Sequence, residues 1–389
     1  MSNQSPSLPD ELNQACGALA RGSFVIIEDD LSSPTVSYLV KQASSVGSDD
    51  VSFMVNVGRG VLCAALTDTR ARELGLALMQ GGPSDGALQF TVSVEARHGV
   101  STGISAHDRA LTLRTLATTT DPEGDLVMPG HIFPVQSQPG GVLVRIGIAE
   151  AVVDLLMLAS TNLVGAFCHC LDSDGNYLSE GAVRSLAEQH SFPIVTISEI
   201  VRTRMVQEPI VERVAESTIP TKSYGTFRAI CFRSKNDGAE HLALVRGAIE
   251  DQPELPVLVR VQAEHRIGDL LGTGSLLHRT VIQGALREID RANHGVFVYI
   301  RHPRRGMLVE QVEALQSGTK RRPMAIQLRE LGIGAQILRS LGAHRIRLLT
   351  NSDVEIPGVK AFQLEIIERV RFSEEPREPF DIAQLPVEI

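Results

Sequence analysis

Three residues in one short stretch of the chain have side chains suited to acid-base chemistry on an anionic substrate. His131, Arg145 and Glu150 lie within residues 129–151, which turn at a Pro-Gly-Gly sequence. An imidazole exchanges protons near neutral pH, and a guanidinium is well suited to an oxyanion or a phosphate. The stretch is therefore a candidate site for proton transfer on a phosphorylated ligand. The alternative is a loop and a strand whose arginine pairs with a nearby acid.

A segment rich in glycine and small hydroxyl residues precedes this stretch, at 99–109, and leads into a helix predicted at 109–117. Backbone N–H groups at a helix entrance of this composition make a natural cradle for an anion. The alternative is an ordinary helix N-cap. The side chains of interest in the segment are those of Thr102, Ser105, Asp108 and Arg109.

A second group of candidate residues lies in the C-terminal half and is rich in arginine and histidine. These residues could form a basic pocket for an anionic ligand, or they could lie on solvated helix faces. The group consists of Arg260, Glu264, His265, His278, Arg301, Arg304, Arg305 and Arg329.

The sequence Cys168-His169-Cys170 has donor atoms that can bind metal ions. On a strand, however, the two cysteines face one way and His169 faces the other. The chain has five cysteines and no second closely spaced pair to complete a four-ligand site. We therefore do not expect a metal site at this sequence.

The elements that must position these residues alternate between strand and helix patterns, which predicts an α/β architecture. Arg145 alternates with apolar β-branched residues over 142–146, which predicts a strand, and a helix is predicted at 151–159. Thr67 is predicted to cap a helix at 67–74, and residues 36–45 are also predicted to be helical.

A chain of 389 residues is long for one hydrophobic core, so two domains are expected. We predict a first domain at 1–206, a second at 207–371 and a tail at 372–389. Two prolines and alternating charge at 207–221 indicate a linker between the domains.

The composition is that of an ordinary soluble protein. A net charge of −9 and a pI near 5.7 argue against a general role in binding nucleic acid or a membrane surface. The most apolar stretch, 142–161, is interrupted by charged residues, and the polar N-terminus carries no export signal. The scattered cysteines fit reduced thiols, so a cytoplasmic location is expected.

Several longer segments match a known family, among them FTVSVEA at 90–96 and RLLTN at 347–351. Together with 99–109, 129–151 and 260–269, these segments are spread along nearly the whole length of the chain. The sequence resembles the bifunctional riboflavin biosynthesis protein, in which 3,4-dihydroxy-2-butanone 4-phosphate synthase is fused to GTP cyclohydrolase II. The resemblance implies two α/β domains, each a mixed sheet with flanking helices. It also implies a dimer with the synthase sites at the subunit interface.

In the first domain, the residues of the opening stretch persist at positions that this family uses. The resemblance assigns a catalytic role to His131 and substrate-binding roles to Arg145, Glu150 and the segment 101–109.

Other positions of the synthase pattern have changed. The resemblance places the two magnesium ligands at Ser32 and Ile148, and a late catalytic glutamate at His169. The family reaction uses the divalent ion to polarise a carbonyl and its neighbouring hydroxyl. Serine and isoleucine cannot hold magnesium, so these departures predict loss of the standard synthase reaction.

The second domain departs from the cyclohydrolase pattern in a similar way. The family binds zinc through three cysteines, and the corresponding region here offers His265 and His278. Two ligands do not make a stable zinc site, so ring opening of GTP is not expected either. Matches to the family remain at one catalytic position, Arg329. They also remain at four substrate-binding positions, which are Arg260, Glu264, Arg305 and Thr350.

Together these features predict a divergent family member that lacks both standard activities. It would bind a phosphorylated sugar or nucleotide, or carry out metal-free chemistry at the first-domain site, and no cofactor is expected although the family uses magnesium and zinc. One alternative is a working riboflavin enzyme that replaces the missing ligands. Another is a non-catalytic partner. It would form mixed dimers with an intact paralogue in place of the homodimer that is otherwise expected for this chain.

Overall fold

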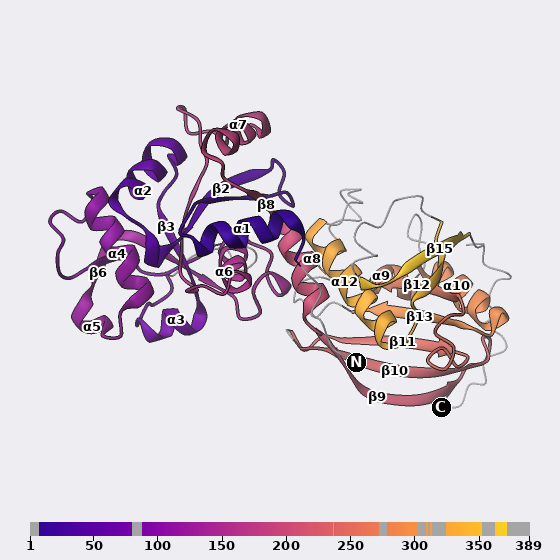
Figure 1. The fold of residues 1–389 in the computed structure, drawn as a ribbon. Helices are drawn as coiled ribbons and strands as arrows, with labels where there is room; N and C mark the ends of the chain where they lie inside the picture. The colour runs from indigo at the N-terminus through magenta and orange to yellow at the C-terminus, as the bar shows by residue number, and fades with distance from the viewer. Residues whose placement is uncertain are drawn as a thin grey trace. The chain divides into compact units, whose positions relative to one another are not determined.

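The computed structural model describes residues 8–79, 88–235, 237–271, 278–301, 309, 312, 324–351 and 362–371, without the side chains of 271, 278 and 324–328. The chain divides into two compact units, residues 1–208 with 323–328 and residues 209–322 with 329–389. Each unit contains one mixed sheet with helices (Figure 1). The predicted fold class, two α/β domains, is therefore confirmed.

The first unit is built on an eight-stranded sheet in the order β4-β6-β3-β7-β2-β1-β8, with β5 paired to β6. Parallel pairing joins β1 to β8 and β3 to β6, and the other pairs are antiparallel. The strands are β1 (Val25–Asp29), β2 (Val36–Gln42), β3 (Cys63–Thr67), β4 (Gln89–Phe90), β5 (Val94–Ala96), β6 (Leu126–Ser137), β7 (Gly165–His169) and β8 (Ile194–Thr196).

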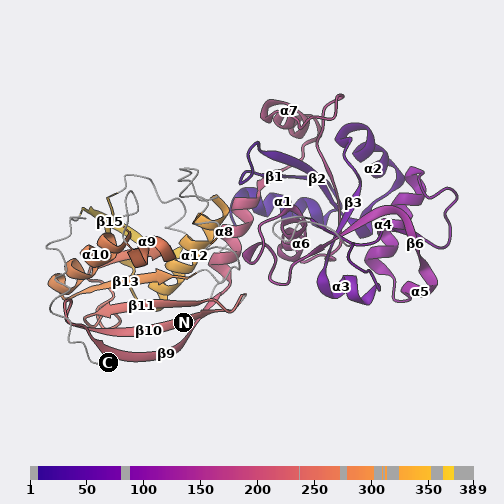
Figure 2. The same ribbon diagram turned by 180° about the vertical axis from the view of Figure 1, so that it is seen from behind.

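Helices cover this sheet. The helices α1, α6 and α8 pack together against β1, whereas α2 and α4 pack against each other and α4 also contacts β5 and β6. Both views show α4 and α5 beside β6 (Figures 1 and 2). The helices are α1 (Asp10–Ala20), α2 (Ser48–Phe53), α3 (Asp68–Glu73), α4 (Ala106–Thr118), α5 (Pro122–Asp125), α6 (Ile148–Leu158), α7 (Glu180–His190) and α8 (Ile197–Gln207).

The prediction of a helix at 36–45 is wrong, because β2 occupies Val36–Gln42. All but the last residue of β2 are buried, and the strand pairs with β1 on one side and β7 on the other. A strand that is buried on both faces lacks the alternation that marks a half-exposed strand, so its apolar residues also fit a helical pattern. The helix with Thr67 as its cap is confirmed as α3, where the Thr67 hydroxyl accepts from the N–H of Arg70.

The second unit has a seven-stranded sheet in the order β15-β14-β12-β13-β11-β10-β9. The four strands from β15 to β13 run parallel, and β11, β10 and β9 continue the sheet antiparallel. The strands are β9 (Val211–Pro220), β10 (Thr226–Ser234), β11 (Glu240–Arg246), β12 (Val257–Ala263), β13 (Gly295–Ile300), β14 (Arg345–Leu349) and β15 (Glu365–Val370). The helices are α9 (Arg266–Leu271), α10 (His278–Ala292) and α12 (Met324–Ser340).

The segment expected to be a linker, 207–221, instead contains the edge strand β9. It pairs with β10 over its whole length, from Val211 opposite Ser234 to Pro220 opposite Thr226. Nearly every residue of β9 is exposed, so the strand is held by its backbone ladder and carries few of the apolar side chains by which a strand is recognised.

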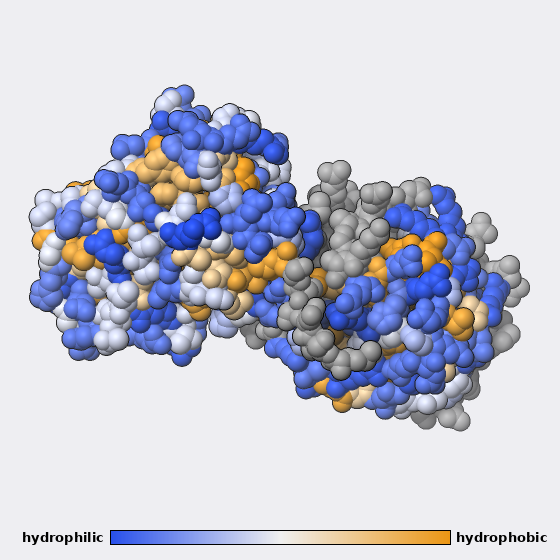
Figure 3. All heavy atoms as spheres, in the orientation of Figure 1, coloured by the Kyte–Doolittle hydropathy of each residue, from blue (hydrophilic) through white to orange (hydrophobic). Residues whose placement is uncertain are grey.

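The face of the protein seen in Figure 3 is mostly polar among the described residues. On the face seen in Figure 3, hydrophilic residues surround separate patches of apolar ones. Within the described ranges, no helix has the length and apolar character needed to cross a membrane.

Candidate functional site

His131 lies on a bulge of strand β6. In the antiparallel pair of β5 and β6, Val94 pairs with Ile132 and Glu95 pairs with Val127, so residues 128–131 of β6 have no partner residue in this ladder. Such bulges re-aim side chains at sheet edges and beside active sites. A hydrogen bond ties the bulge to the residue just before β5, because the N–H of Gly130 donates to the Ser93 hydroxyl at 3.2 Å.

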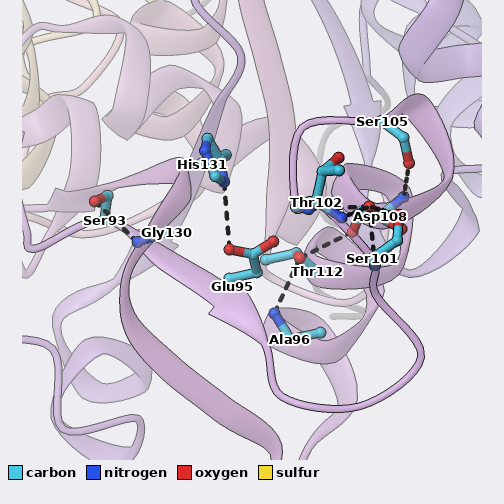
Figure 4. A network of polar contacts seen from close by, with 11 residues as sticks. Ser93, Glu95, Ala96, Ser101, Thr102, Ser105, Asp108, Thr112, Gly130 and His131 are labelled. Atoms are coloured by element: carbon cyan, nitrogen blue, oxygen red, sulfur yellow. Dashed lines mark hydrogen bonds and ion pairs between the residues drawn. The ribbon is translucent and has the colours of Figure 1, made fainter.

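The bulge turns His131 toward Glu95, and Figure 4 shows the imidazole facing this carboxylate. The His131 Nδ1 and Glu95 Oε2 atoms lie 3.3 Å apart. The imidazole is 43% exposed and the carboxylate 14%, so a proton-exchanging ring faces outward with an acid behind it. Sequence reasoning found His131 but did not single out Glu95. Its position in the family-matching segment 90–96 was the only available signal.

The loop at 101–105 is held together by Asp108, the third residue of α4. One Asp108 oxygen, Oδ2, accepts from the backbone N–H groups of Ser101, Thr102 and Gly103 at 3.0–3.2 Å, and from the Ser101 hydroxyl at 3.0 Å. Burial raises the pKa of the Asp108 carboxyl, but these hydrogen bonds lower it more, so it stays ionised. The anion predicted for this cradle is thus provided, at these N–H groups, by the chain itself.

Two other predicted residues of this segment lie at the start of α4. The Ser105 hydroxyl accepts from the N–H of Asp108 and caps the helix, and the Thr102 side chain is exposed. Arg109 is half-buried, and its Nε atom has no hydrogen-bond partner among the described residues. Burial lowers the pKa of Arg109, as expected for a guanidinium with no anion beside it in the described part of the chain.

Arg145 does not lie on a strand, and this prediction is wrong. It follows a short 3₁₀ turn, η3 (Gly141–Leu143), in which Gly140 and Gly141 both have positive φ. The turn is fixed from a distance because Asp154 accepts from the N–H of Val142 at 2.8 Å. A sequence pattern of β-branched residues cannot reveal this tertiary anchor.

The side chain of Arg145 pairs with Glu150, as the more conservative sequence interpretation expected. Its Nε donates to Glu150 Oε1 at 2.8 Å, and the same oxygen accepts from the N–H of Gln138. Arg145 also donates to the carbonyl of Gln136. The two residues therefore join the end of β6 to the first turn of α6, and a phosphate would have to share Arg145 with these acceptors.

The two positions that the resemblance assigns to magnesium do not offer charged ligands in this chain. Ile148 begins α6 and is 3% exposed. The Ser32 hydroxyl donates to Asp29 Oδ2 at 2.6 Å. In the ranges that the structure describes, no three side chains of His, Cys, Asp or Glu gather as a metal site would require. The side chains at these positions do not fit the ion.

His169, at the position of the family's late glutamate, is surrounded by aromatic rings. Its ring lies 4.6 Å from that of Tyr38 and 5.8 Å from that of Tyr177, between ring centroids. Burial lowers the pKa of His169, which favours the neutral imidazole. The neighbouring thiols of Cys168 and Cys170 are buried, and burial raises the pKa of both.

In the second unit, several predicted residues are already engaged with protein groups. Arg260 donates to the Leu349 carbonyl at 3.1 Å, and Arg329 forms an ion pair with Asp237. Glu264 forms ion pairs with two arginines, since its Oε1 atom lies 3.6 Å from Arg266 Nε and 3.8 Å from Arg301 Nε.

The structure brings two of the predicted substrate residues of the second unit together. Arg260 and Thr350 line a mainly apolar cavity of about 150 Å³ beside α12. His265 lies just before α9, and its Nδ1 atom accepts from the N–H of Gly268 in the first turn of that helix. Arg304, Arg305 and the side chain of His278 lie outside the described residues.

Gly130 offers a direct test of the bulge that carries His131. A Cβ atom added at Gly130 would lie 2.1 Å from the carbonyl carbon of Val94, a backbone contact that no side-chain rotation can relieve. We expect Gly130→Ala to lower the unfolding free energy by about 1–3 kcal/mol, through overpacking between β5 and β6. Chemical denaturation measures this change.

The matched control is Gly181→Ala in the first turn of α7, where an added Cβ meets nothing within 4 Å. This control should leave stability unchanged or raise it by up to about 1 kcal/mol, because alanine favours a helix. Equal effects of the two substitutions would contradict the close approach of the strands at Gly130.

Comparisons with known proteins match both units. The model of the 3,4-dihydroxy-2-butanone 4-phosphate synthase family matches residues 13–203, and that of GTP cyclohydrolase II matches residues 212–371. The riboflavin biosynthesis protein RibBA of Chlorobium phaeovibrioides is 35% identical over 379 residues, which cover 94% of this chain and 92% of the relative. A probable monofunctional riboflavin biosynthesis protein of rice, RIBA 3, is 37% identical and covers 92% of this chain and 69% of its own.

Among solved structures, RibBX from A. baumannii, described as a two-domain 3,4-dihydroxy-2-butanone 4-phosphate synthase, is similar over both units. It is 31% identical, with a TM-score of 0.77, and the match covers 92% of this chain and 98% of RibBX. A 3,4-dihydroxy-2-butanone 4-phosphate synthase solved in complex with two magnesium ions is 32% identical, with a TM-score of 0.47, over 50% of this chain and 95% of its own.

These matches correct the expectation that no cofactor is needed. The first unit matches the 3,4-dihydroxy-2-butanone 4-phosphate synthase family and the second matches GTP cyclohydrolase II, and the resemblance implies that these families use magnesium and zinc. The expectation relied on Ser32 and Ile148 in the first domain and on His265 and His278 in the second, and a few changed positions do not determine what a whole site binds. Metal ions therefore have to be supplied in any test of activity.

Proposed function

Because this chain belongs to the family of riboflavin biosynthesis proteins with a 3,4-dihydroxy-2-butanone 4-phosphate synthase domain and a GTP cyclohydrolase II domain, we propose that its first domain binds a phosphorylated sugar and rearranges it in a synthase-type reaction. The observation that carries the proposal is the outward-facing imidazole of His131 on the β6 bulge.

His131 would act as the general acid and base of this reaction. Rearrangement of a keto sugar phosphate needs protons removed from, and returned to, groups beside a carbonyl. A half-exposed imidazole can do both near neutral pH. His131 comes from a bulge that is tied to Ser93 through Gly130, so the ring is offered from a fixed backbone.

The phosphate of the substrate would be bound near the start of α4. Arg109 lies there with a half-buried guanidinium that has no ion pair within the described residues, and the exposed Thr102 hydroxyl is close in sequence. A guanidinium and a hydroxyl are suitable donors to phosphate oxygens. The loop beside them is held in place by Asp108, so its shape does not depend on the ligand.

One relative supports placing the reaction in the first domain. RibBX has two domains and is described as a 3,4-dihydroxy-2-butanone 4-phosphate synthase. The rice protein is described as probably monofunctional, a name that does not require two activities.

A second candidate function is binding of a phosphorylated ligand without the standard turnover. It is favoured by Ser32 and Ile148, which give the first domain no charged ligand at the two positions that the resemblance assigns to magnesium. A protein of this kind could regulate an intact paralogue, in a mixed dimer.

One experiment separates the two candidates. Purified protein is incubated with ribulose 5-phosphate, with magnesium and with a chelator, and formation of 3,4-dihydroxy-2-butanone 4-phosphate is followed by NMR. Calorimetry on the same samples measures binding. Product formation supports the synthase proposal, and binding without product supports the second candidate. Absence of both product and binding would refute the two together.

A further inference from the structure

Glu95 lies where it can control the chemistry of His131. The ladder of β5 and β6 shifts register between Val94 and Glu95, at the same point where the β6 bulge projects His131. Glu95 Oε2 is 3.3 Å from His131 Nδ1, and Figure 4 shows no other labelled side chain between the two groups.

The chemistry of the two groups fixes the direction of this contact. An ionised carboxylate has only acceptor atoms, so the His131 nitrogen that faces it must carry the proton. In a neutral imidazole only one ring nitrogen is protonated. A proton held on Nδ1 therefore leaves Nε2 with a free lone pair, the form needed by a general base.

Gly103 packs closely against the Glu95 carboxylate. A Cβ atom built on Gly103 would lie 1.4 Å from Glu95 Oε1, so the backbone of the 101–105 loop fits directly against the carboxyl group. Gly103 has a φ of +77°, and its N–H donates to Asp108. The loop that Asp108 holds thus limits the positions open to Glu95.

The exposure of the pair also fits this role. Glu95 is mostly shielded, whereas 43% of the His131 side chain remains accessible. In an arrangement of this kind the acid stays behind the ring and the substrate approaches the other nitrogen. Because the Glu95 carboxylate is shielded, it competes little with an anionic substrate that approaches the exposed side of the ring.

We propose that Glu95 is a positioning residue that fixes His131 in the tautomer with its proton on Nδ1 and leaves Nε2 to exchange protons with the substrate. The tautomer assignment stands on the geometry alone, and the use of Nε2 rests on the proposed function. Glu95 acts through His131 and does not itself have to touch the substrate.

Nitrogen chemical shifts of the His131 ring test the tautomer in the whole protein without any substrate. We expect the Nδ1–H form to predominate in the wild type. In Glu95→Gln, whose amide can donate as well as accept, the preference should fall to a mixture of tautomers. A predominant Nε2–H form in the wild type, or an unchanged ratio in the variant, would overturn the proposal.

If the protein converts ribulose 5-phosphate, steady-state kinetics give a second measurement. Glu95→Gln should lower kcat on the order of 100-fold with little change in KM, because the ring is mispositioned but the phosphate contacts remain. The control is Glu73→Gln, which removes an exposed partner of Arg70 on α3 and should change neither readout. If the protein turns over no substrate, the proposed function fails, while the nitrogen shifts still decide the role of Glu95.

Discussion

Replacing His131 with glutamine is expected to lower the turnover of ribulose 5-phosphate by about 10²–10⁴-fold, the usual contribution of one general acid-base group. Glutamine keeps a polar side chain of similar reach but cannot exchange a proton near neutral pH. The imidazole is partly exposed and is not part of the core, so folding should survive the change. Steady-state kinetics with magnesium present measures the effect, and thermal unfolding checks the fold.

The control for this substitution is His98→Gln, three residues after Glu95 and exposed on the surface. It should keep wild-type turnover. Full activity of His131→Gln would remove His131 from the reaction. Loss of activity in both variants would point to a general effect of changing surface histidines.

Replacing Arg204 with methionine is expected to lower the unfolding free energy of the first unit by about 3–5 kcal/mol, the cost of stranding one member of a buried ion pair. The Arg204 Nη1 and Asp154 Oδ2 atoms are 2.6 Å apart, and the two side chains are only 7% and 4% exposed. The guanidinium also donates to the carbonyl of Gly140 and to Glu208. A single substitution therefore breaks the link between α6, α8 and the turn before Arg145.

The pKa shifts of the pair agree with this expectation. Burial raises the pKa of Asp154 to about 6, and the charge of Arg204 opposes the rise. Burial lowers the pKa of Arg204, but the hydrogen bond to Glu208 and the charge of Asp154 outweigh this effect, so the net shift of the pKa is upward. The arginine is thus the member that stays charged, and without it the carboxyl of Asp154 would take up a proton.

The matched control is Arg184→Met on α7, which removes an arginine from an exposed pair with Glu180. Those side chains are 64% and 72% exposed, and ion pairs in solvent contribute little to stability. Denaturant unfolding of both variants measures the difference. A loss at Arg204 as small as the loss at Arg184 would contradict the buried pair.

Local sequence signals predicted the elements whose stability is local. Thr67 marks the start of α3 because its hydroxyl caps the helix within the same segment, and the fold class follows from the alternation of strand and helix patterns. Arg145 was misplaced because the turn before it depends on Asp154, a residue twelve positions away whose role no local pattern reveals. The strand β9 was missed for a related reason, since its partner β10 supplies most of what holds it.

The candidate site was predictable in its residue types but not in its pairings. His131 was expected from the sequence, and its contact with Glu95 depends on a bulge that forms only once β5 and β6 pair. The cradle at 101–105 was expected to accept an external anion, but Asp108 fills its N–H groups. Residue types and their spacing identify the hydrogen-bond donors of a site, whereas only the folded chain shows which acceptor each donor reaches.

The pairing of β1 with β8 has a consequence for the growing chain on the ribosome. Ile26 pairs with Ile194, so the second edge of β1 stays uncovered until roughly 170 more residues have been added. At synthesis rates of about 5–20 residues per second, this takes on the order of 10–30 s. During that interval an apolar strand near the start of the chain has one free side. A nascent chain interrupted before residue 194 would keep that side open, and would be a natural substrate for chaperones.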